Sequence, residues 1–417
     1  NIAYGYFKLK EYDQAGDYFD NQIAKVKDDK VRLNDSYLRL GDCRFVTSKY
    51  TSALEAYNKV IELKSVDADY AYFQKAICYG FISKNDKKIE ELNAFLKFYP
   101  KSDYRDDAYF ELGNTYTSEN KPDLAIKTYD KLNSEFVKGS YTSKAILRQG
   151  LIYYNSDKDD LALTKFKKVA ADFPKTPEAL EAVSTARLIY VDNGRVDEYA
   201  TWVRTLDFVA VTDAELDNDT YEAAEKQYLQ NNTKQAITGF SGYVSKFPKG
   251  IHSLKANFYL AQLYFSDAQE SKSIPNYEYV ISEPRSEFTE QSLSRLAQIF
   301  LKSNNYDKAI LALLRLENEA DFPQNKTFAQ SNLMRCYYDK KDYDNSVIYA
   351  DKVLENPKTD DNVKSDAQII IARSAIQTGD EMKARSAYAK LHTIAKGELA
   401  AEALYYDAYF KNKDEKF

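Results

Sequence analysis

The sequence predicts an all-α fold, a solenoid of antiparallel helix pairs, on the basis of three observations. The stretches 107–136 and 144–174 are two copies of one pattern of small, aromatic and polar residues. Small residues then recur along the whole chain with a spacing of about 37 residues, which is typical of a helix-pair repeat. Glycine (13) and proline (9) are scarce among the 417 residues, which suits helices joined by short turns.

The first copy defines the expected elements in order. Gly113 lies in the first helix, where a large side chain would keep the two helices of a pair apart. A polar turn follows, and the second helix carries Ala125 and, four residues later, the aromatic Tyr129. The second copy repeats these positions as Gly150, Ala162 and Phe166. We therefore expect close helix contacts at the glycines, filled on either side by the aromatic rings.

The same frame extends over the chain and predicts about eleven repeats. The small residue of the first helix recurs as Ala3, Gly41, Ala76, Gly113, Gly150, Ala224, Ala261, Ala297 and Ala372, with Met334 in one repeat and an unclear position near Ala186. Prolines that end repeats recur every 74 or 75 residues, at Pro100, Pro174, Pro248 and Pro323.

This frame divides the chain into three parts. Residues 1–174 form a first array of repeats, and residues 219–417 form a second array that stops inside a further repeat. Residues 175–218 fit the frame worst, since DFVAVTDAELDNDT (207–220) replaces the proline-marked junction. Two interpretations remain for them: a divergent repeat with an extended connection, or a hinge. Because neither end reads as a polar cap, we expect the chain to be a fragment, with any signal peptide or lipid anchor outside it.

The pattern of Gly113, Tyr116, Ala125 and Tyr129 resembles the tetratricopeptide repeat. This resemblance implies a right-handed superhelix whose concave face binds proteins. The stretches YPKSDYRDDAYFELGNTY, DFPKTPEA and KFPKGIHSLKANFYLAQLYF are similar to repeats of bacterial cell-envelope proteins, among them the BAM-type outer-membrane assembly lipoprotein and the Tol-Pal coordinator. VTDAELDNDTYEAAEKQYL resembles the large multi-repeat envelope proteins of Bacteroidota.

Composition and motifs argue against several function classes. Basic (58) and acidic (64) residues are well mixed, without the basic excess of a nucleic-acid-binding surface. No apolar run approaches the length of about 18 residues that spans a bilayer. We find no catalytic constellation, phosphate loop or metal-ligand spacing, and His252 and His392 lie far apart. The sequence predicts a non-enzyme without cofactor or metal.

The three cysteines occupy one position of the repeat, two residues after the small residue of a first helix. They are Cys43, Cys78 and Cys336. We interpret them as small buried hydrophobes. The alternative, a bridge between Cys43 and Cys78, is disfavoured because equivalent points on stacked helices lie about 9–10 Å apart.

A further face of the first helices is rich in aromatic residues. Positions three before, one after and four after each small residue share a side of a helix with 100° between residues. They give a candidate groove made of Phe7, Phe45, Phe73, Phe110, Asn114, Tyr154, Tyr221, Tyr228, Phe258, Phe265 and Tyr338. Two interpretations stand: rings that pack between successive first helices, or an exposed groove for an apolar or aromatic peptide. Asn114 alone matches the Lys and Asn set that binds chaperone C-termini, so that subtype is not expected.

The sequence thus predicts a non-catalytic scaffold that binds partner proteins or peptides as part of a multiprotein complex. We expect a periplasmic or outer-membrane-associated location, in outer-membrane assembly or secretion. The alternatives are a cytoplasmic adaptor or regulator, and the non-catalytic arm of a larger enzyme or secretion machine.

Overall fold

A computed structural model describes residues 2–26, 28–394 and 396–415, and within them it contains 23 helices and no strand. The chain divides into two compact units, Asn1–Val211 and Thr212–Phe417. The helices of the first unit are α1 (Ile2–Lys8), α2 (Tyr12–Lys25), α3 (Lys30–Val46), α4 (Tyr50–Leu63), α5 (Ala68–Phe81), α6 (Asn85–Phe98), α7 (Arg105–Ser118), α8 (Pro122–Glu135), α9 (Thr142–Tyr154), α10 (Asp159–Asp172), α11 (Pro177–Asp192) and α12 (Val196–Val203).

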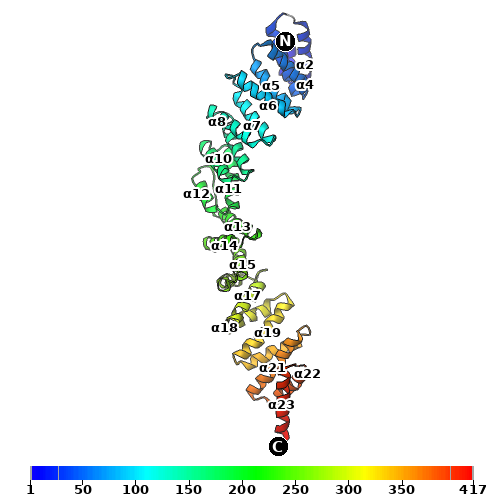
Figure 1. The fold of residues 1–417 in the computed structure, drawn as a ribbon, viewed down its shortest axis with the longest axis vertical. Coiled ribbons are helices and arrows are strands. Elements are labelled where there is room, and N and C mark those ends of the chain that lie inside the picture. The colour runs from blue at the N-terminus through cyan, green and yellow to red at the C-terminus, as the bar shows by residue number, and fades with distance from the viewer. Residues whose placement is uncertain (1, 27, 395, 416–417) are drawn as a thin grey trace. The chain divides into compact units, whose positions relative to one another are not determined.

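The second unit is built in the same way. Its helices are α13 (Asp213–Leu229), α14 (Thr233–Lys246), α15 (Ser253–Ser266), α16 (Glu270–Ser282), α17 (Thr289–Lys302), α18 (Tyr306–Glu319), α19 (Pro323–Asp339), α20 (Tyr343–Glu355), α21 (Asp361–Thr378), α22 (Glu381–Ile394) and α23 (Glu398–Glu415). Figure 1 labels most of them along the chain.

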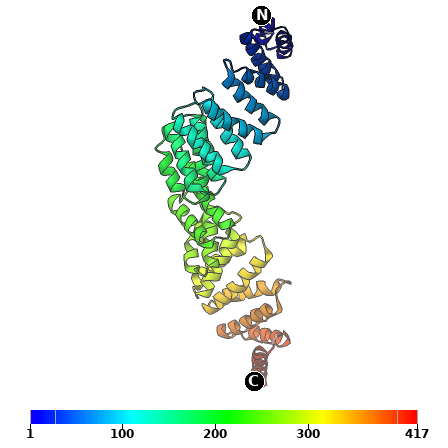
Figure 2. The same cartoon turned by 45° about the horizontal axis from the view of Figure 1, so that its top comes forward.

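Within each unit, consecutive helices pack as pairs and each pair packs on the next. The contacts of α3 with α4 and of α4 with α5 in the first unit have counterparts in α19 with α20 and α20 with α21 in the second. Figure 2 shows the helices of the first unit lying side by side as hairpins. The predicted all-α solenoid of helix pairs is therefore confirmed, with eleven pairs followed by α23 in the described part of the chain.

The close approach of the two helices in a pair depends on the small residue of the first helix. A Cβ atom added to Gly113 would lie 2.4 Å from Cε1 of Tyr129, which is fully buried. The equivalent distances are 2.6 Å from Gly41 to Tyr57 and 2.5 Å from Gly150 to Phe166. These separations are far shorter than van der Waals contact, so a side chain at these glycines would push the pair apart. The predicted contact is confirmed.

The turn inside each pair contains one residue in the left-handed region. After α7 this residue is Asn120 (φ 53°), and the N–H of Lys121 donates to the carbonyl of Tyr116 over 2.8 Å. This bond is the long one of a Schellman motif, which satisfies a carbonyl at the helix end. The left-handed residue recurs in every pair of the described chain, as Lys10, Ser48, Ser83, Asn120, Asp157, Gly194, Asn231, Ala268, Asn304, Lys341 and Gly379.

Polar contacts between pairs join residues about one repeat apart. Lys49 Nζ donates to Asp13 over 2.7 Å, Asn85 to Glu119 over 2.7 Å, and Arg285 to Asp321 over 2.6 Å. Exposed ion pairs of this kind stabilise a fold by at most about 1 kcal/mol each. Their separations of 34 to 36 residues show instead that the repeats at these three junctions meet in a similar register.

The divergent repeat keeps this register. Ala186 of α11 is fully buried at the small-residue position, and Gly194 (φ 67°) occupies the left-handed turn position. Helix α12 has only eight residues, and residues 204–212 connect it to α13. The irregular stretch is therefore shorter than the expected 207–220, because α13 begins at Asp213.

Helix α13 begins there because of its local chemistry. Thr212 and Glu215 form a capping box, in which each side chain accepts a hydrogen bond from the other residue's backbone N–H. One turn further, the carboxylate of Asp217 is 5% exposed and accepts hydrogen bonds from the Tyr243 hydroxyl and the Ile251 N–H. These contacts fasten the start of the second unit to the loop after α14.

The tight contact at Gly113 is testable by the smallest possible side chain. Gly113→Ala should lower the free energy of unfolding by about 1–3 kcal/mol, because the new methyl group overlaps the buried ring of Tyr129. Gly242→Ala is the matched control, since nothing lies within 4 Å of its added Cβ on α14. That variant should gain about 0.5–1 kcal/mol from the better helix propensity of alanine. Urea unfolding of both variants checks this, and a Gly113→Ala variant as stable as the parent would contradict the contact.

The connection between α12 and α13 is the subject of the hinge hypothesis, which remains a prediction. We expect limited trypsin digestion to cut first after Arg204, since residues 204–212 lie outside any helix. Digestion should leave two resistant fragments that match the two compact units. Initial cleavage within the helix-pair turns, with 204–212 intact, would argue against a hinge. Mass spectrometry of the first products distinguishes these outcomes.

Candidate functional site: a cleft between first helices of unit 1

The candidate groove residues are distributed over first helices in both units. Phe7, Phe45, Phe73, Phe110, Asn114 and Tyr154 lie in the first unit, and Tyr221, Tyr228, Phe258, Phe265 and Tyr338 lie in the second. Phe73 (8% exposed), Tyr221 (2%) and Phe258 (7%) are buried. The remaining eight are half-buried. The three buried rings thus offer little surface to a partner.

Four rings at the position three before the small residue each stack on a ring at an equivalent position of the next repeat. Phe110 stacks on Tyr141 with 4.7 Å between ring centroids, and Phe258 stacks on Phe288 with 4.5 Å. The same arrangement joins Phe73 to Tyr104 and Tyr221 to His252. Each partner lies just before the next first helix or at its N-cap, nine residues before the next small residue. This recurrence is visible in the sequence and marks rings that pack between repeats. The groove prediction did not take it into account.

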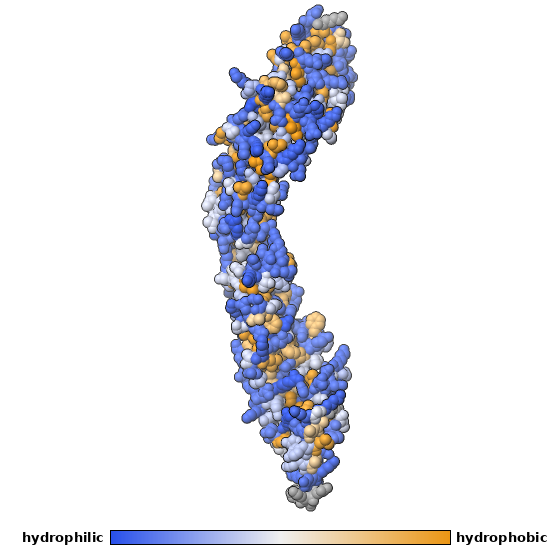
Figure 3. Space-filling model, viewed as in Figure 1, coloured by the Kyte–Doolittle hydropathy of each residue, from blue (hydrophilic) through white to orange (hydrophobic). Residues whose placement is uncertain are grey.

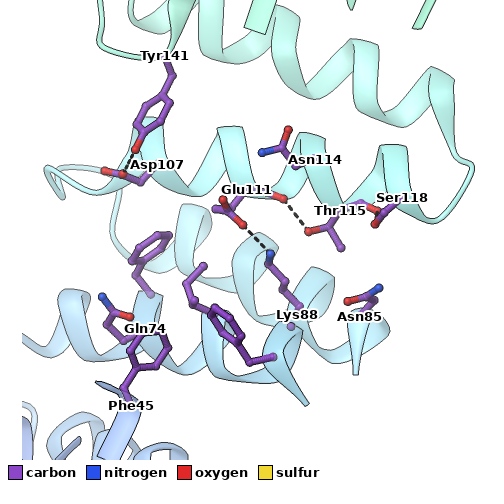
Figure 4. Close-up of a pocket in the computed structure, with 14 residues that line it drawn as sticks. Phe45, Gln74, Asn85, Lys88, Asp107, Glu111, Asn114, Thr115, Ser118 and Tyr141 are labelled. Carbon is purple, nitrogen blue, oxygen red and sulfur yellow. Dashed lines mark hydrogen bonds and ion pairs between the residues drawn. The ribbon is translucent and has the colours of Figure 1, made fainter. Parts of the chain in front are cut away.

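A cleft of about 680 Å³ opens on this face of the first unit. Its walls come from α3, α5, α6 and α7, with one residue from the segment before α9 (Figure 4). It is lined by Phe45, Phe73, Gln74, Ile77, Gly80, Phe81, Asn85, Lys88, Asp107, Glu111, Asn114, Thr115, Ser118 and Tyr141. Three of the predicted groove residues, Phe45, Phe73 and Asn114, are therefore brought together here.

The floor of the cleft is aromatic and partly open to solvent. Phe81 at the end of α5 is 56% exposed. Its ring stacks on Tyr50 with centroids 4.7 Å apart and meets Phe45 edge-on at 5.4 Å. These contacts hold an exposed ring in one orientation, which is the condition for an aromatic anchor of a binding site. Phe81 lies five residues after Ala76, outside the positions from which the sequence analysis built the groove.

The wall opposite the floor is formed by α7 and is polar. Glu111 is paired with Lys88 of α6, with 2.6 Å between Nζ and Oε2. Asp107, one turn earlier on α7, accepts a hydrogen bond from the Tyr141 hydroxyl over 2.7 Å. The Asn114 amide oxygen accepts a hydrogen bond from the buried Tyr129 hydroxyl over 2.8 Å. Its amide nitrogen is then the atom that Asn114 can offer to a ligand.

Burial and charge alter the acidity of these groups. The pKa of Asp107 is raised, chiefly by burial and further by the charges of Asp106 and Glu111, although the Tyr141 hydrogen bond partly opposes this rise. The same bond is the largest cause that raises the pKa of Tyr141 to about 12. Tyr141 is therefore a neutral donor at physiological pH.

Among the other clefts of the described residues, one in each unit is lined mainly by polar side chains. The one in the second unit has a volume of about 590 Å³, and Glu290 lies in it. That carboxylate accepts hydrogen bonds from the backbone N–H groups of Asp321 and Phe322 and from the Asn325 side chain, so it has a structural role. The other, near the start of the first unit, has a volume of about 710 Å³ and includes Tyr4 and Asp35.

The described residues contain no cluster of three or more His, Cys, Asp or Glu side chains suited to a metal ion. None of the described helices is both long and apolar enough to cross a membrane. Cys43, Cys78 and Cys336 are free and buried, as the sequence analysis expected.

Comparison with known proteins supports the repeat assignment. Residues 106–134 and 144–176 each match a family model described as a tetratricopeptide repeat. This chain contains tetratricopeptide repeats. No curated protein matches the chain. Tetratricopeptide repeats are typical of scaffolds that bind other proteins, and no catalytic family is indicated.

Several solved structures match part or all of this chain at low sequence identity. The MamA protein has 19% identity and a TM-score of 0.34, covering 48% of this chain and 94% of MamA. The C-terminal part of a TPR repeat-containing protein from Cytophaga hutchinsonii has 18% identity and a TM-score of 0.35, covering 62% and 99%. A structure of Naa15/Naa10 bound to HypK-THB has 14% identity and a TM-score of 0.39, covering 100% and 66%.

The buried cysteines of this repeat protein yield a prediction about thiol reactivity. Burial raises the pKa of Cys43 and Cys78 to about 12 and that of Cys336 to about 11, against about 8.5 for a free thiol. At pH 8 the native protein should therefore react very slowly with an aromatic disulfide reagent, and all three thiols should react rapidly in urea. The stabilisation linked to these neutral thiols is complete below about pH 8.5 and is lost as the pH rises toward their native pKa. Rapid reaction of the native protein would contradict their burial.

Proposed function

We propose that this chain is a non-catalytic scaffold that binds segments of partner proteins, and that the cleft lined by α3, α5, α6 and α7 is one of its docking sites. The observation that carries the proposal is Phe81, an exposed ring fixed by Tyr50 and Phe45 at the floor of a cleft. Aromatic residues, Phe included, are enriched at the core of protein interfaces. A ring whose orientation is already fixed loses little side-chain entropy on binding. The family match supports the general class of function.

The surroundings of the floor suit a peptide better than a small apolar molecule. Gln74, Asn85 and Thr115 line the cleft beside the rings. The Gln74 amide is able to hydrogen-bond a peptide backbone, whose N–H and C=O groups need partners when they leave water. The Asn85 amide already donates to Glu119, and the Thr115 hydroxyl donates to the Glu111 carbonyl. An aromatic floor with a polar rim is the usual composition of a protein-binding patch.

The test uses exposed rings on two faces of the same unit. Phe81→Ala should weaken the binding of docked peptides by about 2 kcal/mol or more, the loss typical of truncating an interface anchor. Phe98→Ala is the matched control, because Phe98 is 62% exposed near the end of α6 and does not line the cleft. Peptides selected from a random phage-displayed library on the parent protein supply the ligands, and fluorescence anisotropy measures their affinity.

Circular dichroism melting of both variants separates loss of binding from loss of fold. If every selected peptide binds Phe81→Ala as tightly as Phe98→Ala, the cleft is not the docking site. Equal loss with both variants would also reject the cleft, since the effect would then come from exposed rings in general.

We further propose that the scaffold acts in a bacterial cell-envelope complex for outer-membrane assembly or secretion. The support is the resemblance of YPKSDYRDDAYFELGNTY and the related stretches to repeats of envelope proteins. Fractionation of cells that express the native protein, followed by detection with an antibody against this chain, tests the location. Recovery with periplasmic or outer-membrane markers is the expected result, and recovery with cytosolic markers would contradict the proposal.

A further inference from the structure

We propose that the unit 1 cleft selects a linear segment carrying an arginine close to an apolar side chain, with the arginine on the α7 wall and the apolar side chain on the aromatic floor. This inference rests on the proposed docking function and names the chemistry of the partner. It follows from the negative charge of the α7 wall, from the lack of a cation beside Asp107 in the cleft, and from the position of this wall opposite the aromatic floor.

The wall carries two carboxylates directed into the same cleft. Asp107 and Glu111 are four residues apart on α7, so they lie on one face of the helix with a rise of about 6 Å between them. Figure 4 shows both side chains on α7 above the floor formed by residues of α3 and α5. A ligand bound in the cleft therefore faces rings on one side and carboxylates on the other.

One of these carboxylates lacks a cationic partner within the cleft. Lys88, the cation in the lining, is engaged by Glu111 at 2.6 Å. The partner of Asp107 is the neutral Tyr141 hydroxyl. Lys144 lies over the Tyr141 ring, with 5.5 Å between Nζ and the ring centroid, and does not line the cleft. The wall therefore has an excess of negative charge at its Asp107 end.

Other acidic groups strengthen this potential. Asp67, Asp69 and Asp103 all act electrostatically on Tyr104, which lies at the same end of α7 as Asp107. Burial raises the pKa of Asp107, which indicates that its charge is poorly solvated. A ligand cation at this place would replace the missing solvation, whereas a carboxylate ligand would be repelled.

The carboxylate of Asp107 favours arginine over lysine. The nearby rings of Phe110 and Tyr141 stack on each other, and Tyr104 covers Phe73, so the preference comes from the carboxylate. A guanidinium group bonds a carboxylate through two parallel N–H groups. A lysine ammonium is more strongly hydrated and provides no such paired contact.

The surface of the chain is mixed in polarity. On the face seen in Figure 3, hydrophobic side chains alternate with hydrophilic ones and do not merge into one broad patch. A short linear segment suits such a surface better than a large apolar one. In an extended peptide, successive side chains point to opposite sides, so we expect the arginine and the apolar residue to be adjacent in the sequence of the segment.

The experiment uses three labelled, capped peptides. The first is acetyl-Gly-Ser-Arg-Phe-Ser-Gly-amide, the second has citrulline in place of arginine, and the third has alanine in place of phenylalanine. Citrulline keeps the shape of arginine without its charge. Fluorescence anisotropy measures binding to the parent protein, Asp107→Asn and Asp123→Asn. Asp123 is the matched control, since it is an exposed carboxylate in the first turn of α8 and does not line the cleft.

The parent protein and Asp123→Asn should bind the arginine peptide roughly tenfold tighter than the citrulline peptide, as expected for one charge-assisted contact. Asp107→Asn should bind these two peptides equally. The preference of the parent for arginine should decrease as salt is added, because the ions screen the contact. The alanine peptide should bind more weakly than the arginine peptide to every protein.

Equal affinity of the parent protein for the arginine and citrulline peptides would overturn the inference, as would a preference that survives in Asp107→Asn. The salt dependence of the parent tests the same contact should Asp107→Asn fail to fold. If library peptides depend on Phe81 but show no arginine preference, the docking function stands and only the partner chemistry is wrong. If no peptide depends on Phe81, the docking site itself is rejected.

Discussion

The contact between a small residue of one helix and a large ring of its partner controls much else in this structure. Tyr129 is fully buried against Gly113, and its hydroxyl donates to Asn114, the next residue of the same first helix. Tyr57 repeats the arrangement with Gly41 and donates to Asp42 over 3.0 Å. One ring thus closes the helix pair and also fixes a polar side chain on the neighbouring face. Packing inside the pair and the shape of that face are two results of the same contact.

Most of the fold could be predicted because this contact requires particular residues at fixed intervals. Gly113 and Gly150 are recognisable in the sequence, and the positions between them follow from the period. The turns were harder, since the left-handed residue is Lys10 in one repeat and Ala268 in another and has no fixed identity. The start of α13 was missed for a related reason. The capping box of Thr212 and Glu215 is a local sequence signal, and it does not follow from the spacing of the small residues.

The candidate site was only partly predictable from the sequence. The exposure of a side chain depends on its position around the helix and also on the residues of the next repeat that cover it. Phe45, Phe73 and Asn114, which were grouped by their position around the helix, line one cleft. This position could not show that Phe73 is covered by Tyr104 from the following repeat. Phe81 lies at the end of α5, where a helix offers more of its circumference to solvent than position around the helix alone suggests. The sequence analysis did not predict the carboxylates of Asp107 and Glu111 in this cleft, because it selected groove positions by their aromatic side chains.

The register of contacts one repeat apart, from Lys49 to Asp13 and from Arg285 to Asp321, has a consequence for how the chain acquires its structure. These contacts join residues that are only about one repeat apart in the sequence. The chain entropy lost when each contact closes the loop between its two residues is therefore small. A growing chain that leaves the ribosome can complete each helix pair once the following pair has emerged. Structure then spreads from the first residues made to the last, and the apolar surface left exposed during synthesis never exceeds the face of about one repeat.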